Sequence, residues 1–407
     1  TGGPAVVVAH GFAGSRQMMQ AYGLTLARAG YTVYAFDFLG HGRHPIPMSG
    51  DVNRIEGTTR LLVEQTRDVI DMAKAGKGDA PVALLGHSMA TDVLVRADDD
   101  AQGQGPLVLL SAFSRAITST SPSDMLLIVG AWEPGLKGFA LEAVRQIEPK
   151  ASFGELVGRD GQRRMAIEAP TVEHVAILHS REGQRAALEW LNGFYDRDRG
   201  AEVPRTGWAL LGLLAAVTAL FGPLARLLPR TETPDKPLTA KTFAAVSLAP
   251  ALAAPLLAAP INTQVLPVLV ADYLALHLLI YGAVQLAVLW WVRGAPGRPA
   301  PLAALLLVVW TIGVFGFALD RYGANFWPTP DRVAIIAALV LGAAPFMLAD
   351  SWLAHGAVLW QRVLARVAFL TSLGLAVALD FKGLFFLLMI APVIVLFYLS
   401  FGLMGRA

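Results

Sequence analysis

The second half of the chain consists of successive apolar stretches, each about 20 residues long. Up to about Arg205 the sequence mixes charged residues, turns and short apolar runs, as a globular domain does. Beyond Arg205 each stretch is long enough to cross the hydrocarbon core of a bilayer, which takes about 20 apolar residues of helix. The mean hydropathy of +0.51 is too high for an average soluble protein, and the excess lies in this half. The sequence therefore predicts a globular domain followed by an all-α transmembrane bundle.

We expect three parts: a domain over residues 1–196, a polar linker over 197–206, and a membrane domain over 207–407 with about seven transmembrane helices. An alternative is that one of these predicted transmembrane helices is re-entrant or divided. Prolines predict kinks in the second and third spans at Pro250, Pro255 and Pro267. The predicted spans lie near 207–228, 239–260, 264–292, 301–320, 332–354, 358–379 and 383–403.

Lysine and arginine in the connecting loops predict the orientation of the membrane domain, because cytoplasmic loops are enriched in both. More of them lie on the side away from the globular domain: Arg226, Arg230, Lys236, Lys241, Arg293, Arg298, Arg362, Arg366 and Arg406. The other side has fewer: Arg205, Arg321, Arg332 and Lys382. We therefore expect an integral, multi-pass membrane protein whose globular domain lies on the extracytoplasmic side.

Two segments of the membrane domain carry an Asp and a His five residues apart: Asp272 with His277, and Asp350 with His355. Ionisable residues inside a bilayer are costly, so each is a candidate for binding a metal or lipid headgroup or for relaying protons. Five-residue spacing places the two side chains about 140° apart on a helix, which makes a site on a single helix unfavourable. The similarity of the segments indicates either an internal duplication or chance in a Leu- and Ala-rich composition.

In the first half, short apolar runs alternate with segments of helical spacing. This order predicts an α/β domain with a mostly parallel sheet, helices on both faces and a ligand site at the carboxyl ends of the strands. The expected helices lie near 16–30, 53–74 and 182–195. The expected strands lie near 5–9, 31–38, 82–85, 107–110, 125–129 and 164–168.

The run Val82–Leu85 leads into Gly86-His-Ser-Met-Ala90, a serine flanked by small residues and followed by a helical pattern. A nucleophile on a strained turn between strand and helix needs small residues at these two flanking positions. Here Gly86 fills the first position, and Ala90 replaces the second glycine of the usual pattern. Ser88 is thus a candidate nucleophile, with the Met89 amide at the start of the helix directed at a developing oxyanion.

Three motifs, His10–Gly14, Asp37–Gly42 and Gly86–Ala90, occur in the order and spacing of the α/β-hydrolase family, which the chain resembles over about residues 4–196. The resemblance implies that Ser88 is the nucleophile. It also implies an oxyanion hole made by the backbone N–H groups of Phe12 and Met89. Members usually have additional strands before the first motif, and the chain begins at Thr1 rather than Met. We therefore expect either an N-terminally truncated hydrolase domain or one with a trimmed sheet.

The family order of serine, acid and histidine implies the rest of the triad. Glu133, after the run Met125–Gly130, is the expected acid, and Asp124 at the start of that run is the weaker alternative. His174, in a loop before the last helix, is the expected histidine, and His179 is the alternative. The resemblance gives the remaining nearby residues structural or pocket-lining roles: His10, Asp37, His41 and His87.

The expected function is that of a membrane-anchored serine hydrolase, an esterase- or lipase-like enzyme that cleaves an acyl ester, expected to be lipidic, through an acyl-enzyme. Alternatives are an acyltransferase with the same triad, or a transporter-like protein with a regulatory hydrolase-fold domain. We expect no metal and no cofactor. The absence of cysteine excludes disulfides and thiol catalysis, and the scattered basic residues with a net charge of +2 argue against nucleic acid. The expected partners are the bilayer and the substrate, and the oligomeric state stays open.

Overall fold

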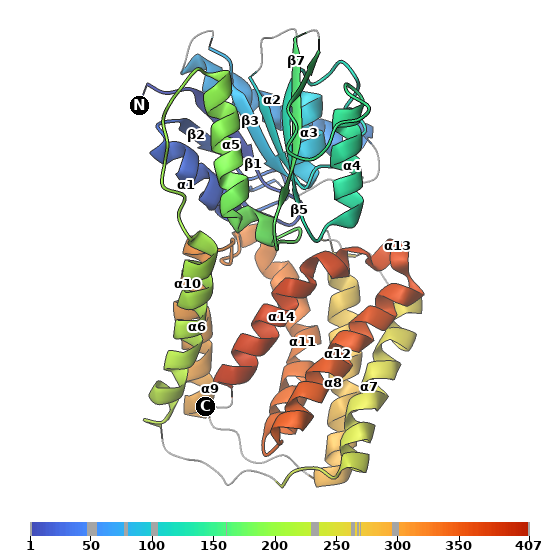
Figure 1. Ribbon diagram of the computed structural model, residues 1–407. Helices are drawn as coiled ribbons and strands as arrows, with labels where there is room; N and C mark the ends of the chain where they lie inside the picture. The colour runs from blue at the N-terminus through green and yellow to red at the C-terminus, as the bar shows by residue number, and fades with distance from the viewer. Residues whose placement is uncertain are drawn as a thin grey trace. The chain divides into compact units, whose positions relative to one another are not determined.

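The structure, a computed structural model, consists of two compact units (Figure 1). The first comprises Thr1–Leu213 together with Ala318–Trp327, and the second comprises Leu214–Phe317 together with Pro328–Ala407. The domain boundaries expected from the sequence stay a prediction. The structure describes residues 2–46, 55–76, 80–98, 105–159, 161–228, 236–261, 265–266, 268, 270–294 and 301–405.

A seven-stranded sheet in the order β2-β1-β3-β4-β5-β7-β6 forms the centre of the first unit. Every neighbouring pair is parallel except β6 with β7, which is antiparallel. Parallel pairing needs crossover connections, and these supply the helices that cover both faces. The strands are β1 (Ala5–Ala9), β2 (Thr32–Ala35), β3 (Ala83–His87), β4 (Leu107–Leu110), β5 (Asp124–Gly130), β6 (Val157–Arg159) and β7 (Gln162–Ala169).

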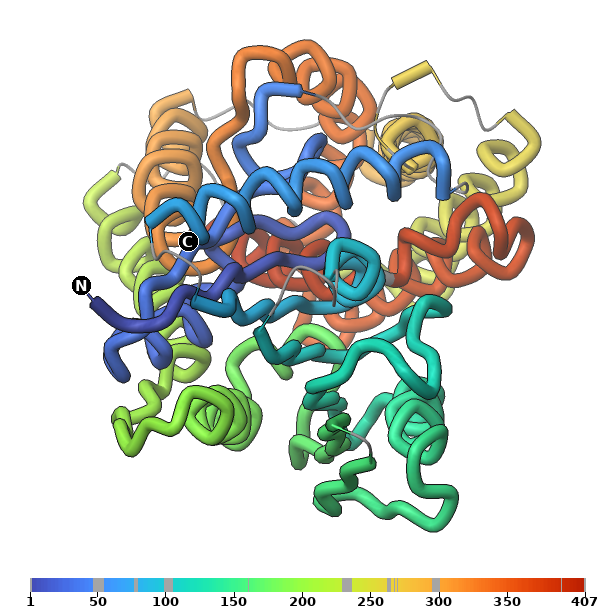
Figure 2. The backbone as a smooth tube through the Cα atoms, turned by 90° about the horizontal axis from the view of Figure 1, so that it is seen from above, coloured from blue at the N-terminus to red at the C-terminus, as the bar shows by residue number. Residues whose placement is uncertain are grey.

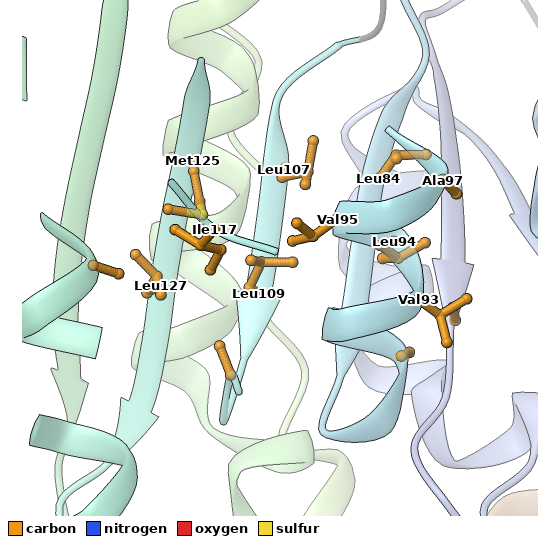
Figure 3. Packing of buried hydrophobic residues seen from close by; sticks show 14 of the residues in the cluster. Leu84, Val93, Leu94, Val95, Ala97, Leu107, Leu109, Ile117, Met125 and Leu127 are labelled. Atoms are coloured by element: carbon orange, nitrogen blue, oxygen red, sulfur yellow. The ribbon is translucent and has the colours of Figure 1, made fainter. Parts of the chain in front are cut away.

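The helices of the first unit lie on opposite faces of this sheet, with α2 on one side and α5 on the other (Figure 2). Alternate strand residues supply the two cores: Val7, Leu84 and Leu109 pack on the α2 side, and Val6, Leu85 and Val108 on the α5 side. Figure 3 shows the first of these cores between β3, β4, β5 and α3. The helices are α1 (Gln20–Arg28), α2 (Arg60–Ala75), α3 (Met89–Ala97), α4 (Pro134–Arg145) and α5 (Arg181–Phe194).

The predicted alternation of strands and helices is confirmed, with differences at the boundaries. Strand β2 ends at Ala35 rather than near residue 38, because Asp37 and Phe38 form the loop that contacts the first βα turn. The helix expected from residue 53 begins as a π-turn at Ile55 and becomes α-helical at Arg60, while residues 53 and 54 lie outside the described part of the chain. Strand β6 was not predicted, because three residues are too few to show a period of two.

Six helices of the described chain are long and apolar enough to cross a membrane, or seven if the bent pair Phe381–Leu388 and Ile390–Met404 is one span. The bend of 51° in this pair fits either of the two alternatives, a divided span or a re-entrant segment. Pro250 and Pro255 lie inside α7, whereas Pro267 lies outside the described residues. The α-helices that follow residue 205 are α6 (Thr206–Ala225), α7 (Ala240–Ile261), α8 (Ala271–Arg293), α9 (Pro301–Val308), α10 (Gly316–Tyr322), α11 (Val333–Ala354), α12 (Leu359–Leu379), α13 (Phe381–Leu384) and α14 (Phe386–Met404). The π-helical turn Val309–Phe315 joins α9 and α10, which together form one candidate span.

Candidate active site

Ser88 lies on a sharp turn between β3 and α3. Its backbone has φ 54° and ψ −119°, a conformation that L residues rarely adopt and that marks a strained functional turn. A Cβ atom at Gly86 would lie 2.5 Å from Leu94 Cδ1 and 3.2 Å from Ala90 Cβ. The small residues that flank the serine are therefore required by the close approach of the helix to the end of its own strand.

The predicted serine, histidine and acid come together at the carboxyl ends of the strands. The Ser88 hydroxyl donates to His174 Nε2 over 2.8 Å, and His174 Nδ1 donates to Glu133 Oε1 over 2.6 Å. Ser88 follows β3, Glu133 is the residue before α4, and His174 lies in the loop after β7. This chain of hydrogen bonds requires the tautomer of His174 that carries its proton on Nδ1, which leaves Nε2 free to accept the serine proton.

Glu133 is 7% exposed and is held by donors on both carboxylate oxygens. Its Oε2 accepts from the Ser111 hydroxyl over 2.8 Å and from the Gly130 N–H over 2.7 Å. Burial alone would raise the pKa of Glu133, but the hydrogen bonds from His174, Ser111 and Gly130 lower it below its usual value. The acid therefore stays ionised opposite the imidazole.

Ser111 is a site residue that the sequence alone did not reveal. It follows β4, the strand between β3 and β5, so its hydroxyl lies at the same sheet edge as Ser88 and Glu133. Its φ of 50° turns the chain sharply there. One signal could have indicated Ser111. It comes directly after an apolar run, and the strand order brings the ends of β3, β4 and β5 together.

The residues expected to form the oxyanion hole border the nucleophile. Met89 is the first residue of α3, where a helical N–H has no acceptor inside the helix. A Cβ atom at Gly11, next to Phe12, would lie 3.0 Å from Ser88 Cβ, so the turn after β1 lies directly against the serine. The oxyanion role of the Phe12 and Met89 amides remains a prediction.

Two buried histidines support the site without joining the hydrogen-bonded triad. His10 Nδ1 donates to the Gly11 carbonyl over 2.8 Å while its Nε2 accepts from the Phe38 N–H over 3.1 Å, which ties the first turn to the loop after β2. His87 Nε2 donates to the His174 carbonyl over 2.8 Å. Burial lowers the pKa of His10 to about 4 and that of His87 to about 3, so both are neutral near pH 7.

The two alternatives for the acid and the histidine lie elsewhere. Asp124 is the first residue of β5, at the opposite end of the strand from Glu133, and its Oδ2 accepts from Arg163 Nε over 2.8 Å. His179 forms a hydrogen bond through Nδ1 with Thr206 Oγ1 over 2.9 Å. Neither contributes to the chain of hydrogen bonds from Ser88.

A segment from much later in the sequence contacts the first βα turn within the first unit. The Asn325 N–H donates to Ser15 Oγ over 3.3 Å, and Asn325 Nδ2 donates to the Gly42 carbonyl over 3.3 Å. Asp320 pairs with the Arg43 guanidinium. Asp320 thereby holds the segment 318–327 against the loop that follows β2.

Among the described residues, the contacts of Asp272, His277 and Asp350 are with partners other than the Asp or His five residues away. Asp272 accepts from the backbone N–H groups of residues 265 and 266, whereas buried His277 contacts the Ser372 hydroxyl over 3.1 Å. Asp350 accepts from the Tyr398 hydroxyl over 2.8 Å and lies 3.7 Å from an Arg366 nitrogen. His355 ends α11. Arg366, counted among the loop residues, lies within α12.

The described part of the chain contains no cluster of three or more His, Asp or Glu side chains that could hold a metal ion.

Residues 3–138 match the family described as serine aminopeptidase, S33. This segment contains Ser88, Glu133 and the strands from β1 to β5 in their parallel order. The first unit has the α/β-hydrolase fold. The family match supports a hydrolase activity for this unit, and the predicted α/β-hydrolase class followed by a helical bundle is confirmed. None of the curated protein sequences matches the chain.

Solved structures of distant sequence are similar to the hydrolase fold. Epoxide hydrolase from an endophytic Streptomyces is 14% identical, covering 48% of this chain and 91% of that one with a TM-score of 0.34. A soluble variant of monoglyceride lipase from Saccharomyces cerevisiae is 11% identical, covering 48% and 88% with a TM-score of 0.35. NosK from Streptomyces actuosus is 14% identical, covering 48% and 100% with a TM-score of 0.36.

Proposed function

We propose that the chain is a membrane-anchored serine hydrolase that cleaves an acyl ester, with Ser88 as nucleophile, His174 as general base and acid, and Glu133 as the residue that orients the imidazole. The observation that carries the proposal is the continuous hydrogen bonding from Ser88 Oγ through His174 to Glu133, at 2.8 and 2.6 Å. A serine on a strained turn beside an oriented, unprotonated imidazole nitrogen is the arrangement that activates a hydroxyl for acyl transfer.

In the first half-reaction the Ser88 oxygen bonds to the acyl carbon while its proton moves to His174 Nε2. The negative charge that develops on the carbonyl oxygen would be stabilised by the backbone N–H groups of Phe12 and Met89. His174 then returns the proton to the departing alcohol oxygen as the ester bond breaks, which leaves an acyl-enzyme on Ser88. The ionised Glu133 offsets the charge of the imidazolium that exists between these two proton transfers.

In the second half-reaction a water molecule gives a proton to His174 Nε2 and attacks the acyl-enzyme. Collapse of the tetrahedral intermediate releases the carboxylic acid, and the proton on His174 returns to Ser88. If an alcohol took the place of water, the same residues would transfer the acyl group to it. The acyltransferase therefore remains an alternative that differs only in the acceptor.

The lipidic nature of the substrate rests on the helices that follow the hydrolase fold. At least six of them are apolar and long enough to cross a bilayer, and attachment to a membrane concentrates the enzyme among lipid substrates. The excess of loop Lys and Arg on the far side of the spans supports an extracytoplasmic hydrolase unit. Protease treatment of sealed spheroplasts should degrade this unit from outside, and complete protection would reverse the orientation.

The family match raises peptide bonds as a second substrate class, since its description is that of an aminopeptidase. A panel of p-nitrophenyl esters with acyl chains of 2 to 16 carbons and a panel of aminoacyl p-nitroanilides would separate the classes. We expect hydrolysis of the esters that rises with chain length and that is lost in Ser88→Ala and His174→Ala. Anilide cleavage above ester cleavage would favour the aminopeptidase.

A transporter with a regulatory hydrolase-fold domain is the remaining alternative. This alternative requires that the function of the chain does not depend on Ser88 as a nucleophile. The absence of ester hydrolysis from the wild-type chain with every ester would favour that function, whereas hydrolysis that persists in the Ser88→Ala chain would contradict Ser88 as the nucleophile.

A further inference from the structure

A cavity of about 710 Å³ lies within the first unit, beside α1 and the edge strand β2. One wall is the face of α1 that carries Leu24 and Ala27, and the opposite wall is the start of α6 with Ala209, Leu210 and Leu213. The spacing of three and four residues places each set on one side of its helix. None of the residues proposed for the triad or the oxyanion hole lines this cavity.

The walls of the cavity are apolar side chains that protein atoms leave partly uncovered. Leu24 is 40% exposed, and Ala27 and Ala209, which line the same half-open cavity, are exposed as well. A volume of this size falls within the range of about 300–1,000 Å³ that is typical of small-molecule sites. An apolar space bordered by an apolar, span-length helix fits a hydrocarbon chain better than it fits water.

The charged side chains that line the cavity are all positive. Arg16 and Arg321 line it, both side chains are exposed, and no Asp or Glu is among the lining residues. Burial lowers the pKa of His179, which also lines the cavity, so its imidazole adds no charge near neutral pH. Two guanidinium groups with no acid among the other lining residues are suited to a phosphate group, which they bind through parallel hydrogen bonds.

The backbone of both arginines is held in place, so that the side chains have fixed starting points. The Arg16 N–H donates to Asp37 Oδ1 over 2.8 Å, and the Arg321 carbonyl accepts from Gln20 Nε2 over 3.4 Å. Gln17, which also lines the cavity, is 8% exposed, and its Oε1 has no hydrogen-bond partner among the described residues. A buried amide oxygen without a partner can accept a hydrogen bond from a ligand hydroxyl group.

We propose that this cavity binds one anionic phospholipid, with the phosphate between Arg16 and Arg321 and an acyl chain between α1 and α6. The presence of both apolar walls and two arginines favours a phospholipid over free phosphate, because free phosphate would leave the apolar walls uncovered. It selects an anionic over a zwitterionic headgroup because the cavity supplies two positive charges and no negative one. The inference is independent of the proposed activity, since it uses none of the triad residues.

Native mass spectrometry of the full chain tests the proposal. The chain is released from neutral detergent micelles after incubation with equal amounts of dipalmitoyl phosphatidylglycerol and dipalmitoyl phosphatidylcholine. We expect the first bound lipid to be phosphatidylglycerol, favoured about tenfold, as two charge-assisted contacts imply. The same preference is expected in a Ser88→Ala chain, which cannot consume the lipid by the proposed chemistry and so separates this site from that function.

Matched variants assign the bound lipid to the cavity. The double change Arg16→Gln with Arg321→Gln should abolish the headgroup preference, whereas Arg28→Gln, at an exposed α1 position outside the cavity, should keep it. Ala209→Trp should obstruct the part of the cavity beside α6 and weaken binding of the first lipid, while Ala215→Trp, an exposed α6 position outside the lining, should not.

Thermal unfolding of each variant confirms that the chain is folded. A wild-type chain without preference between the two lipids would overturn the proposal. So would a preference that survives both the double arginine change and Ala209→Trp in folded chains.

Discussion

Single side chains of the site keep Glu133 ionised and keep the imidazole proton of His174 on Nδ1. The Nδ1 proton of His174 faces an ionised Glu133, whose pKa is held down by three hydrogen bonds despite its burial. Ser111 supplies one of these from outside the triad. The imidazole therefore presents an unprotonated Nε2 to Ser88, which is the requirement for general-base activation.

Ser111→Ala tests the positioning of Glu133. Loss of the hydroxyl removes a donor to the carboxylate, so the pKa of Glu133 should rise and the acid limb of the pH profile should move to higher pH. We expect kcat/KM for the best ester to fall about tenfold, as for the loss of one hydrogen bond to a charged group. Ser114→Ala, which removes a buried hydroxyl bound to Asp92, is the control and should leave the pH profile unchanged. An unchanged profile in Ser111→Ala would contradict this role.

The buried histidines predict how stability changes with pH. His10 and His87 have pKa values of about 4 and 3 in the fold, against 6.5 for an ordinary imidazole, so only the unfolded chain binds their protons between pH 6.5 and pH 4. Stability should fall as pH drops through this window, by about 2 kcal/mol for each imidazole at pH 5. Thermal unfolding of His87→Gln should lose part of this dependence relative to a His44→Gln control, and equal dependence in both would contradict it.

At the scale of elements, the junction of β3 with α3 requires a residue without a side chain at Gly86. Gly86→Val would place carbon atoms against Leu94 and Ala90, and we expect a loss of about 1–3 kcal/mol in unfolding free energy, as for overpacked cores. Gly135→Ala is the matched control, because no atom lies within 4 Å of its added Cβ in the first turn of α4. It should be neutral or stabilising by up to about 1 kcal/mol. Chemical denaturation measures both, and equal effects would contradict the steric account.

Sequence reasoning was most successful where local pattern and family order agree. The apolar run before Ser88 and the positions of Glu133 and His174 after later strands were enough to predict three side chains that the fold brings together. Ser111 could not be inferred, because its contact depends on which strands are neighbours. Strand β6 and the early end of β2 were missed because short segments at a sheet edge are defined by pairing and loop contacts rather than by hydrophobic period.

At the scale of the whole molecule, the first unit is not a continuous piece of sequence. Residues Ala318–Trp327 belong to it, and they contact Ser15, Gly42 and Arg43 nearly 300 positions earlier. Neither segment carries a sequence pattern that predicts contact between the two. The first βα turn is thereby linked to a stretch that comprises the end of the candidate span Pro301–Tyr322 and the residues that follow it.

Asp320→Asn tests this link in the full chain. Asp320 accepts from the N–H groups of Phe326 and Trp327 and pairs with Arg43, so loss of its charge should loosen the segment that carries Asn325. We expect faster amide hydrogen exchange at residues 13–16 and 40–43, with a modest effect on stability because the Arg43 side chain is 42% exposed. Asp331→Asn, an exposed acid in a nearby turn of the sequence, is the control, and unchanged exchange in Asp320→Asn would contradict the link.

The central claim is that Ser88 is a nucleophile activated by His174. Its most direct test is the intact mass of the full chain after treatment with an alkyl fluorophosphonate, with the modified residue identified by peptide mapping. We expect one phosphonyl group, located on Ser88, in the wild-type chain and none in Ser88→Ala, with labelling of His174→Ala slowed by at least about a hundredfold. A wild-type chain that stays unmodified, or a modification that persists in Ser88→Ala, would contradict it.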